Sequence, residues 1–190
     1  MEISEFQKNI SVINEFIYFD ENDYLREKTN NPLKLKEFIA NAKYLLSENE
    51  EHKYYLCVII GNLYRICEEP QDALNYLHEC LNISLEEGNI KKEIVSLIRL
   101  GEALKYANQH QKALELFNSA LTKCHDNRVE LYLDFTLQHK GKCLMELGEL
   151  EEAETCFVQS LKLREQKAEP SLIKSTELAL NLIRTLKKKN

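Results

Sequence analysis

The sequence predicts an all-α protein, folded as a right-handed superhelical stack of antiparallel helix pairs with capping helices. Two observations lead to this fold class. Glycine (5) and proline (3) are scarce among the 190 residues, which argues against a turn-rich β fold that needs those residues at its corners. Three segments also align with one another without a gap, and internal repetition at a fixed period is typical of repeat arrays.

The repeat is visible in the spacing of small and apolar residues. Glycines at 61, 101 and 141 and alanines at 73, 113 and 153 both recur every 40 residues, and each alanine is followed four positions later by Leu77, Phe117 or Phe157. A glycine inside a helical pattern costs about 1 kcal/mol relative to alanine, so it usually marks the close approach of another helix. Each unit is therefore expected to be two antiparallel helices that pack tightly where both side chains are small.

The segment before the repeats is expected to form a helical pair. Residues 2–19 carry apolar side chains at helical spacing, and Asn31-Pro32 starts a second helix through about Leu46. The polar stretch 20–30 between them is expected to be a loop. Residues 1–50 thus resemble a degenerate repeat that has lost its glycine.

Caps and turns predict where the repeat helices begin and end. The sequence Ser-Glu-Asn-Glu at 47–50 is a capping box that would open the first helix, and Asp126 is expected to cap the first helix of the third repeat. Pro70 suits the first turn of a helix, and Gly88 suits the end of one. Tight turns inside the second and third repeats are expected at 108–110 and 148–149.

The last segment, 169–190, is expected to be a single capping helix opened by Pro170. A lone terminal helix covers the apolar face that the final repeat of a stack leaves exposed. The predicted organisation is one continuous domain: 1–50, three repeats over 51–168, and 169–190.

These slots resemble the tetratricopeptide repeat, whose signature places Leu-Gly before Ala-x-x-x-Phe. Leu100-Gly101 followed by Ala113 and Phe117 matches it, and the third copy repeats the last two positions. The resemblance covers about 51–168. The period of 40 exceeds the usual length of about 34 residues, which implies longer helices. Long-helix variants occur in kinesin light chains, spindle-orientation adaptors and peptide-pheromone receptors, and the resemblance to these classes implies peptide binding.

Composition argues against several classes of function. A net charge of −6 does not suit general binding to a phosphate backbone, so no nucleic-acid partner is expected. No stretch reaches the roughly 20 apolar residues of a membrane span, and the N-terminus lacks the pattern of a secretory signal. We therefore expect a cytoplasmic protein that does not bind membranes, whose six cysteines are reduced packing residues.

The residues that could support catalysis or bind a metal are not spaced as a catalytic site would require. The five histidines are scattered, and the adjacent Cys124 and His125 point in different directions on a helix. There is no glycine-rich phosphate loop, and the carboxylates cluster at expected helix starts and loops. The sequence therefore predicts no enzyme, no metal and no cofactor.

The resemblance directs attention to the groove that the first helix of each repeat would line. Chaperone-adaptor members clamp a C-terminal carboxylate with a fixed set of Lys, Asn and Arg, of which only Asn62 is matched here, so that ligand class is rejected. The remaining groove positions are mixed apolar and basic, with Glu102 as the only acidic residue among the positions considered. The candidate ligand-binding residues are Tyr55, Asn62, Arg65, Arg99, Lys105, Phe135 and Lys142.

Two functions stay open at this point. The first is a protein- or peptide-binding module that holds an acidic peptide or helix in a locally basic groove. The second is a self-assembly module in which the repeats mediate homo-oligomerisation. A plainer explanation of the groove charges also remains, because Arg99, Glu102 and Lys105 lie at i,i+3 spacing and neutralise one another.

Overall fold

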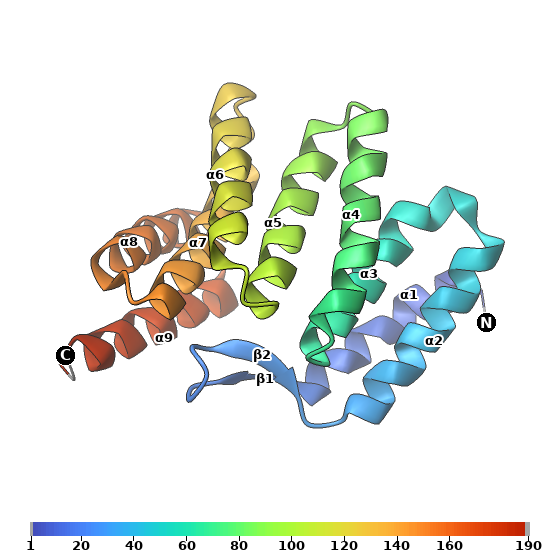
Figure 1. Ribbon diagram of the computed structural model, residues 1–190, viewed down its shortest axis with the longest axis horizontal. Helices are drawn as coiled ribbons and strands as arrows, with labels where there is room; N and C mark the ends of the chain where they lie inside the picture. The colour runs from blue at the N-terminus through green and yellow to red at the C-terminus, as the bar shows by residue number, and fades with distance from the viewer. Residues whose placement is uncertain (1, 189–190) are drawn as a thin grey trace.

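The helix pairs are stacked side by side along the chain. The computed structural model describes residues 2–188, and Figure 1 shows the stack running from the N-terminal helices to the C-terminus. Its three pairs and the helix after them are α3 (Lys53–Ile66) with α4 (Pro70–Glu86), α5 (Ile90–Tyr106) with α6 (His110–Asp126), α7 (Leu133–Leu147) with α8 (Leu150–Lys167), and α9 (Pro170–Lys187). The predicted stack of antiparallel helix pairs is confirmed.

The repeated glycines lie where the two helices of each pair cross. A Cβ atom on Gly101 would stand 2.7 Å from Cε1 of Phe117, and one on Gly141 would stand 2.8 Å from Cε1 of Phe157. The close neighbour of these two glycines is thus the apolar residue sixteen positions later, rather than the alanine that the sequence suggested. The alanines at 73, 113 and 153 are fully buried at the same crossings.

Enlarging the central glycine is expected to overpack its crossing. Phe117 is fully buried, so Gly101→Leu should lower the free energy of unfolding by about 1–3 kcal/mol or more. Glu86→Ala, at an exposed position of α4, should change it by less than about 0.5 kcal/mol. Urea melts of the two variants measure the difference, and equal midpoints would contradict this packing.

Most of the predicted helix ends are confirmed, but two are wrong. Pro70 opens α4 and Gly148 ends α7 with φ +83°, as expected from their residue types. The capping box does not form, because α2 continues through Glu48 and the Ser47 hydroxyl donates to the Tyr44 carbonyl. Asp126 belongs to the end of α6, and a 3-10 turn precedes α7 with no side-chain cap.

The N-terminal segment differs most from the prediction. The first helix stops early, at α1 (Ile3–Asn9), and is followed by a 3-10 helix (Ile10–Phe16) and by two antiparallel strands, β1 (Ile17–Asp20) and β2 (Arg26–Thr29), before α2 (Pro32–Glu48). Residues 16–19 are aromatic or β-branched and favour a strand. The expected loop over 20–30 is therefore part of a β-hairpin.

The last helix covers the end of the stack. Ala179 and Ile183 of α9 are fully buried in one apolar cluster with Leu144 and Phe157. Removing 169–190 should expose this apolar surface, so the shortened chain should aggregate or dimerise. Sedimentation velocity and circular dichroism measure this, and a monomer of unchanged helicity would show that α9 is not a cap. Within residues 2–188, no helix has the length and apolar character needed to cross a membrane.

Candidate functional site

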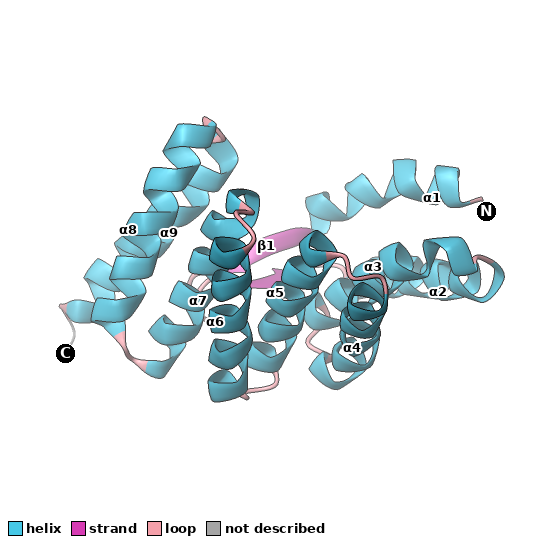
Figure 2. Ribbon diagram, turned by 90° about the horizontal axis from the view of Figure 1, so that it is seen from above, coloured by secondary structure: helices cyan, strands magenta, loops and turns pink. Residues whose placement is uncertain are grey.

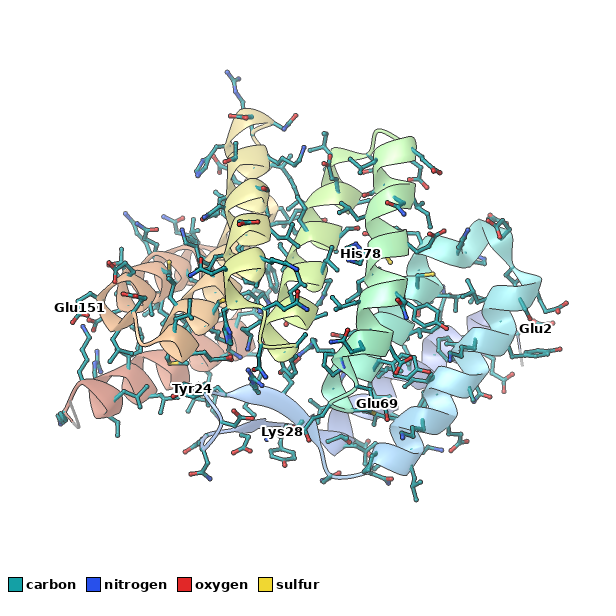
Figure 3. The ribbon with its side chains drawn as sticks, in the orientation of Figure 1. Glu2, Tyr24, Lys28, Glu69, His78 and Glu151 are labelled. Carbon is teal, nitrogen blue, oxygen red and sulfur yellow. The ribbon has the colours of Figure 1, made fainter. Side chains whose placement is uncertain are left out.

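The hairpin lies on the side of α3, α5 and α7 that the sequence assigned to the groove. We call this side the inner face and define it by Asn62, Arg65, Arg99, Lys105 and Lys142. Figure 2 shows the strands on the side of α5 that is turned away from α4, and Figure 3 labels Tyr24 and Lys28 where the hairpin passes below α5. The hairpin contacts residues near the C-terminal ends of all three helices.

Glu27 of β2 is held by both its side chain and its backbone. Its carboxylate accepts a hydrogen bond from Arg65, which is only 1% exposed. The Tyr106 hydroxyl accepts from the Glu27 N–H at 2.6 Å and lies 3.2 Å from the Glu27 carbonyl. Burial opposes ionisation of Glu27, but Arg65 outweighs it and lowers the pKa of that carboxyl. The contacts therefore fix the position of the strand and of an ionised carboxylate on α3 and α5.

Arg26 lies beside the Tyr106 ring and binds Glu146 of α7. Its guanidinium lies 2.6 Å from a Glu146 oxygen and 5.1 Å from the Tyr106 ring centre. Glu146 also pairs with the buried Lys105 and lies 2.9 Å from the His110 ring nitrogen. Burial disfavours the charged carboxylate, yet Arg26 and Lys105 lower the pKa of Glu146 to about 2. Glu146 thus joins the hairpin to two repeats.

The turn of the hairpin places Leu25 against α7. Leu25 is 3% exposed and shares an apolar cluster with Leu144 and Met145. Its carbonyl accepts a 2.9 Å hydrogen bond from Lys142 Nζ, and that nitrogen lies 4.5 Å from the Phe19 ring centre. Burial is the main reason that the pKa of Lys142 falls to about 8. Leu25 and Lys142 therefore attach the turn of the hairpin to the third repeat.

Glu102 lies at the centre of the inner face, among three cationic or titratable side chains. Its carboxylate is 2.9 Å from Arg99, 3.7 Å from Arg65 and 3.2 Å from His139 Nδ1. Burial opposes its ionisation, but Arg65, His139 and Arg99 together hold the pKa of Glu102 well below its usual range. For His139, burial outweighs the attraction of Glu102 and lowers the pKa of the ring to about 4.

The pKa of His139 predicts a loss of stability in mild acid. In the unfolded chain the His139 ring takes up a proton at its ordinary pKa near 6.5, whereas in the folded chain the pKa of the ring is about 4. Stability should therefore fall as pH drops through this window, by roughly 2–3 kcal/mol from this group. Chemical denaturation between pH 7 and 4 measures the slope. His139→Gln should flatten it and His125→Gln, at an exposed position, should not; equal slopes in all three proteins would contradict the assignment.

Part of the inner face is left uncovered, between the N-terminal halves of α5 and α7. A pocket of about 130 Å³ opens there. Arg99 stands at this pocket with 36% of its side chain exposed, so it is more accessible than Arg65, Lys105 and Lys142. The lining residues are Val95, Ile98, Arg99, Tyr132, Phe135 and His139.

The structure divides the predicted site residues between two environments. Arg99 and Phe135 line the open pocket, and Tyr55 is half-buried on α3. Beneath the hairpin, Asn62 accepts a hydrogen bond from Arg65, and the Lys105 and Lys142 side chains are engaged as described above. The expectation of a locally basic groove is wrong, because Glu27, Glu102 and Glu146 pair with three of its cations, Arg65, Arg99 and Lys105. The fourth cation, Lys142, donates to a backbone carbonyl.

Sequence reasoning missed the most connected residues of this surface. Tyr106 and Glu146 were not among the predicted groove positions, and the hairpin was assigned to the end of a helix (2–19) and to a loop (20–30). One available signal was the strand-forming run at 16–19. Another was the length of a structureless connection of eleven residues (20–30) inside a compact domain, which is unusual.

A second depression lies away from the inner face. A larger cleft of about 830 Å³ lies between α6, α7 and α8, with leucines such as Leu121 and Leu137 in its lining. Among residues 2–188, no group of three or more His, Cys, Asp or Glu side chains is arranged to hold a metal ion.

Comparison with known proteins identifies the repeat. Sequence profiles described as tetratricopeptide repeat match residues 54–124 and 136–167, which include all three glycine crossings. The chain belongs to the tetratricopeptide-repeat family. No curated protein sequence matches it. The predicted family is thus confirmed, and tetratricopeptide-repeat folds are typical of protein–protein interaction rather than catalysis.

Solved structures with the same fold are distant in sequence. A Rap protein complexed with competence and sporulation factor has a TM-score of 0.73 at 19% identity, and the match covers 84% of this chain and 46% of that one. The apo form of RapI has a TM-score of 0.67 at 19% identity, with 84% and 59% covered. A putative kinesin light chain from Podosopora anserina has 0.62 at 11% identity, with 84% and 82% covered. This tetratricopeptide-repeat chain therefore spans about half the length of the Rap proteins, and these likenesses show the fold alone.

Proposed function

We propose that this tetratricopeptide-repeat protein is a polypeptide-binding module and that its partner binds on the inner face. The observation that carries the proposal is the hairpin itself. Side chains of three successive repeats already hold a short segment of the chain there, through Arg65, Tyr106 and Glu146. Both the Rap protein and this chain share the stacked fold, and the Rap structure contains competence and sporulation factor.

The open pocket on α5 and α7 is where we expect a partner to dock first. Val95 and Phe135 offer an apolar lining, and Arg99 stands beside them as the accessible cation. A partner segment with one large apolar side chain next to a carboxylate would satisfy both features. Because the Arg99 contact is partly exposed, affinity should fall as the salt concentration rises.

The test compares capture of partners from cell extract by variants of one helix. Arg99→Gln removes the accessible charge, and Val95→Phe fills the pocket; each should reduce capture of the same partner by about tenfold, the effect of losing roughly 1.4 kcal/mol of binding free energy. Lys91→Gln, at an exposed position in the first turn of α5, is the matched control and should leave capture unchanged.

Three outcomes distinguish the sites. Capture that survives both pocket variants at wild-type affinity across a salt series would remove the inner face as the docking surface. Loss of capture through substitutions in the cleft between α6 and α8 would assign the partner to the outer face. A concentration-independent dimer in sedimentation would favour the alternative of self-assembly. The cytoplasmic location and the absence of nucleic-acid and membrane partners stay predictions.

A further inference from the structure

We propose that the covered half of the inner face is itself a recognition site for a segment with the order leucine, arginine, glutamate, filled here by the chain's own Leu25, Arg26 and Glu27. The inference rests on the proposed function and deepens it, since it names the kind of segment that this surface takes. The occupant we assign is such a segment of a partner protein, which would replace the hairpin.

Each of the three side chains meets a different partner on the repeats. Leu25 enters an apolar cluster with Leu144. Arg26 lies between Glu146 and the Tyr106 ring. Glu27 pairs with Arg65. The order of these partners along the stack runs from α7 to α3. A segment with the three side chains in another order would place like charges together or remove the carboxylate that Glu27 presents to the buried Arg65.

The repeats also bind the backbone of the segment. Tyr106 accepts a hydrogen bond from the N–H of Glu27 and lies within hydrogen-bond distance of its carbonyl. Lys142 donates to the carbonyl of Leu25. Backbone contacts combined with separate positions for alternate side chains are the way in which extended peptides are recognised. The surface therefore has the composition of a peptide site.

The hairpin depends on this surface more than the helix pairs depend on the hairpin. Each strand is four residues long, and a lone two-stranded hairpin is marginally stable at best. Tyr18, Phe19 and Tyr24 remain 46%, 40% and 38% exposed. The glycine crossings that hold the helix pairs together involve no hairpin residue. Release of the hairpin should therefore leave the stack folded.

The turn of the hairpin carries backbone strain. Tyr24 and Leu25 adopt left-handed conformations with φ of +51° and +57°, which are unfavourable for residues with side chains. The hairpin belongs to the same chain as the inner face, so its effective concentration at that face is high, and this offsets the strain. Weakening the tethered contacts should consequently allow a separate segment to compete.

The experiment uses the full chain and a fluorescently labelled synthetic peptide of residues 16–30 as the probe. Fluorescence anisotropy compares the wild-type chain with chains that carry Leu25→Ala or Glu27→Gln, after circular dichroism has shown wild-type helicity. Both variants should bind the peptide at least tenfold more tightly than the wild-type chain does. A peptide with Glu27→Lys should not bind. Variants that bind no more tightly than wild type, or equal binding of the two peptides, would overturn the proposal.

A second measurement needs no variant. In the wild-type chain, an excess of the peptide should accelerate hydrogen exchange at the Glu27 amide and leave exchange in the middle of α5 unchanged. Unchanged exchange at Glu27 under saturating peptide would overturn the proposal as well.

These results separate the inference from the proposed function. If the peptide does not bind but capture of the partner still depends on Arg99, only the covered site is contradicted. If the peptide binds but Arg99→Gln leaves capture of the partner unchanged, only the open pocket is contradicted.

Discussion

Replacing Arg65 by glutamate is expected to lower the free energy of unfolding by about 5 kcal/mol or more. Arg65 is 1% exposed and pairs with Glu27 and Glu102, so the variant would bury three carboxylates together. Breaking a buried pair leaves a charge without compensation, which is far more costly than losing an exposed one. Equilibrium unfolding in urea, monitored by circular dichroism, measures the change.

The control for this prediction lies one repeat further along the same face. Arg99 is 36% exposed, so Arg99→Gln should cost no more than about 1 kcal/mol. Equal losses in the two variants would show that Arg65 is not buried in an ion-pair network. Arg65 and Lys105 are both 1% exposed, so reversing the charge of either residue should destabilise the fold.

Removal of the Glu146 carboxylate is expected to cost about 3–5 kcal/mol, because Glu146→Ala would leave a buried lysine without a counter-charge. Glu146 is 3% exposed and Lys105 2%, and Arg26 of the hairpin shares the same carboxylate. The variant should therefore weaken the packing of α5 on α7 and also weaken the attachment of the hairpin. Urea unfolding reports the first effect, and hydrogen exchange in the hairpin reports the second.

Two further variants test the cause of that loss. Glu115→Ala, at an exposed position of α6, should change stability by less than about 0.5 kcal/mol. Glu146→Leu combined with Lys105→Met removes both buried charges, and should recover most of the lost stability because apolar replacement of a buried pair is often neutral. A double variant as unstable as Glu146→Ala would contradict the explanation by an unpaired charge.

The repeat could be predicted from the sequence because its physical cause is local and recurs. A glycine must face Phe117 or Phe157 across a helix crossing in two of the three repeats, and Leu77 in the other, so a spacing of forty residues is visible without a structure. Pro70 and Gly148 mark helix ends through their own backbone preferences. These features depend on single residue types at fixed positions.

The second strand of the hairpin could not be predicted, because its stability comes from residues distant in the chain. β2 consists of Arg26, Glu27, Lys28 and Thr29 and has no apolar alternation to indicate a strand. Arg65, Tyr106 and Glu146 hold it from 38 to 120 residues away. For the same reason, the inner face seemed basic when its lysines and arginines were counted without the carboxylates that fold onto them.

Hydrogen exchange at the Glu27 amide of the wild-type chain tests most directly whether the inner face holds an extended polypeptide. This amide donates to the Tyr106 hydroxyl, so it should exchange far more slowly than the amide of Asn22 in the exposed turn, and the protection should be lost in Glu146→Ala. Exchange of Glu27 at the rate of an unfolded chain in the wild-type protein would contradict the account.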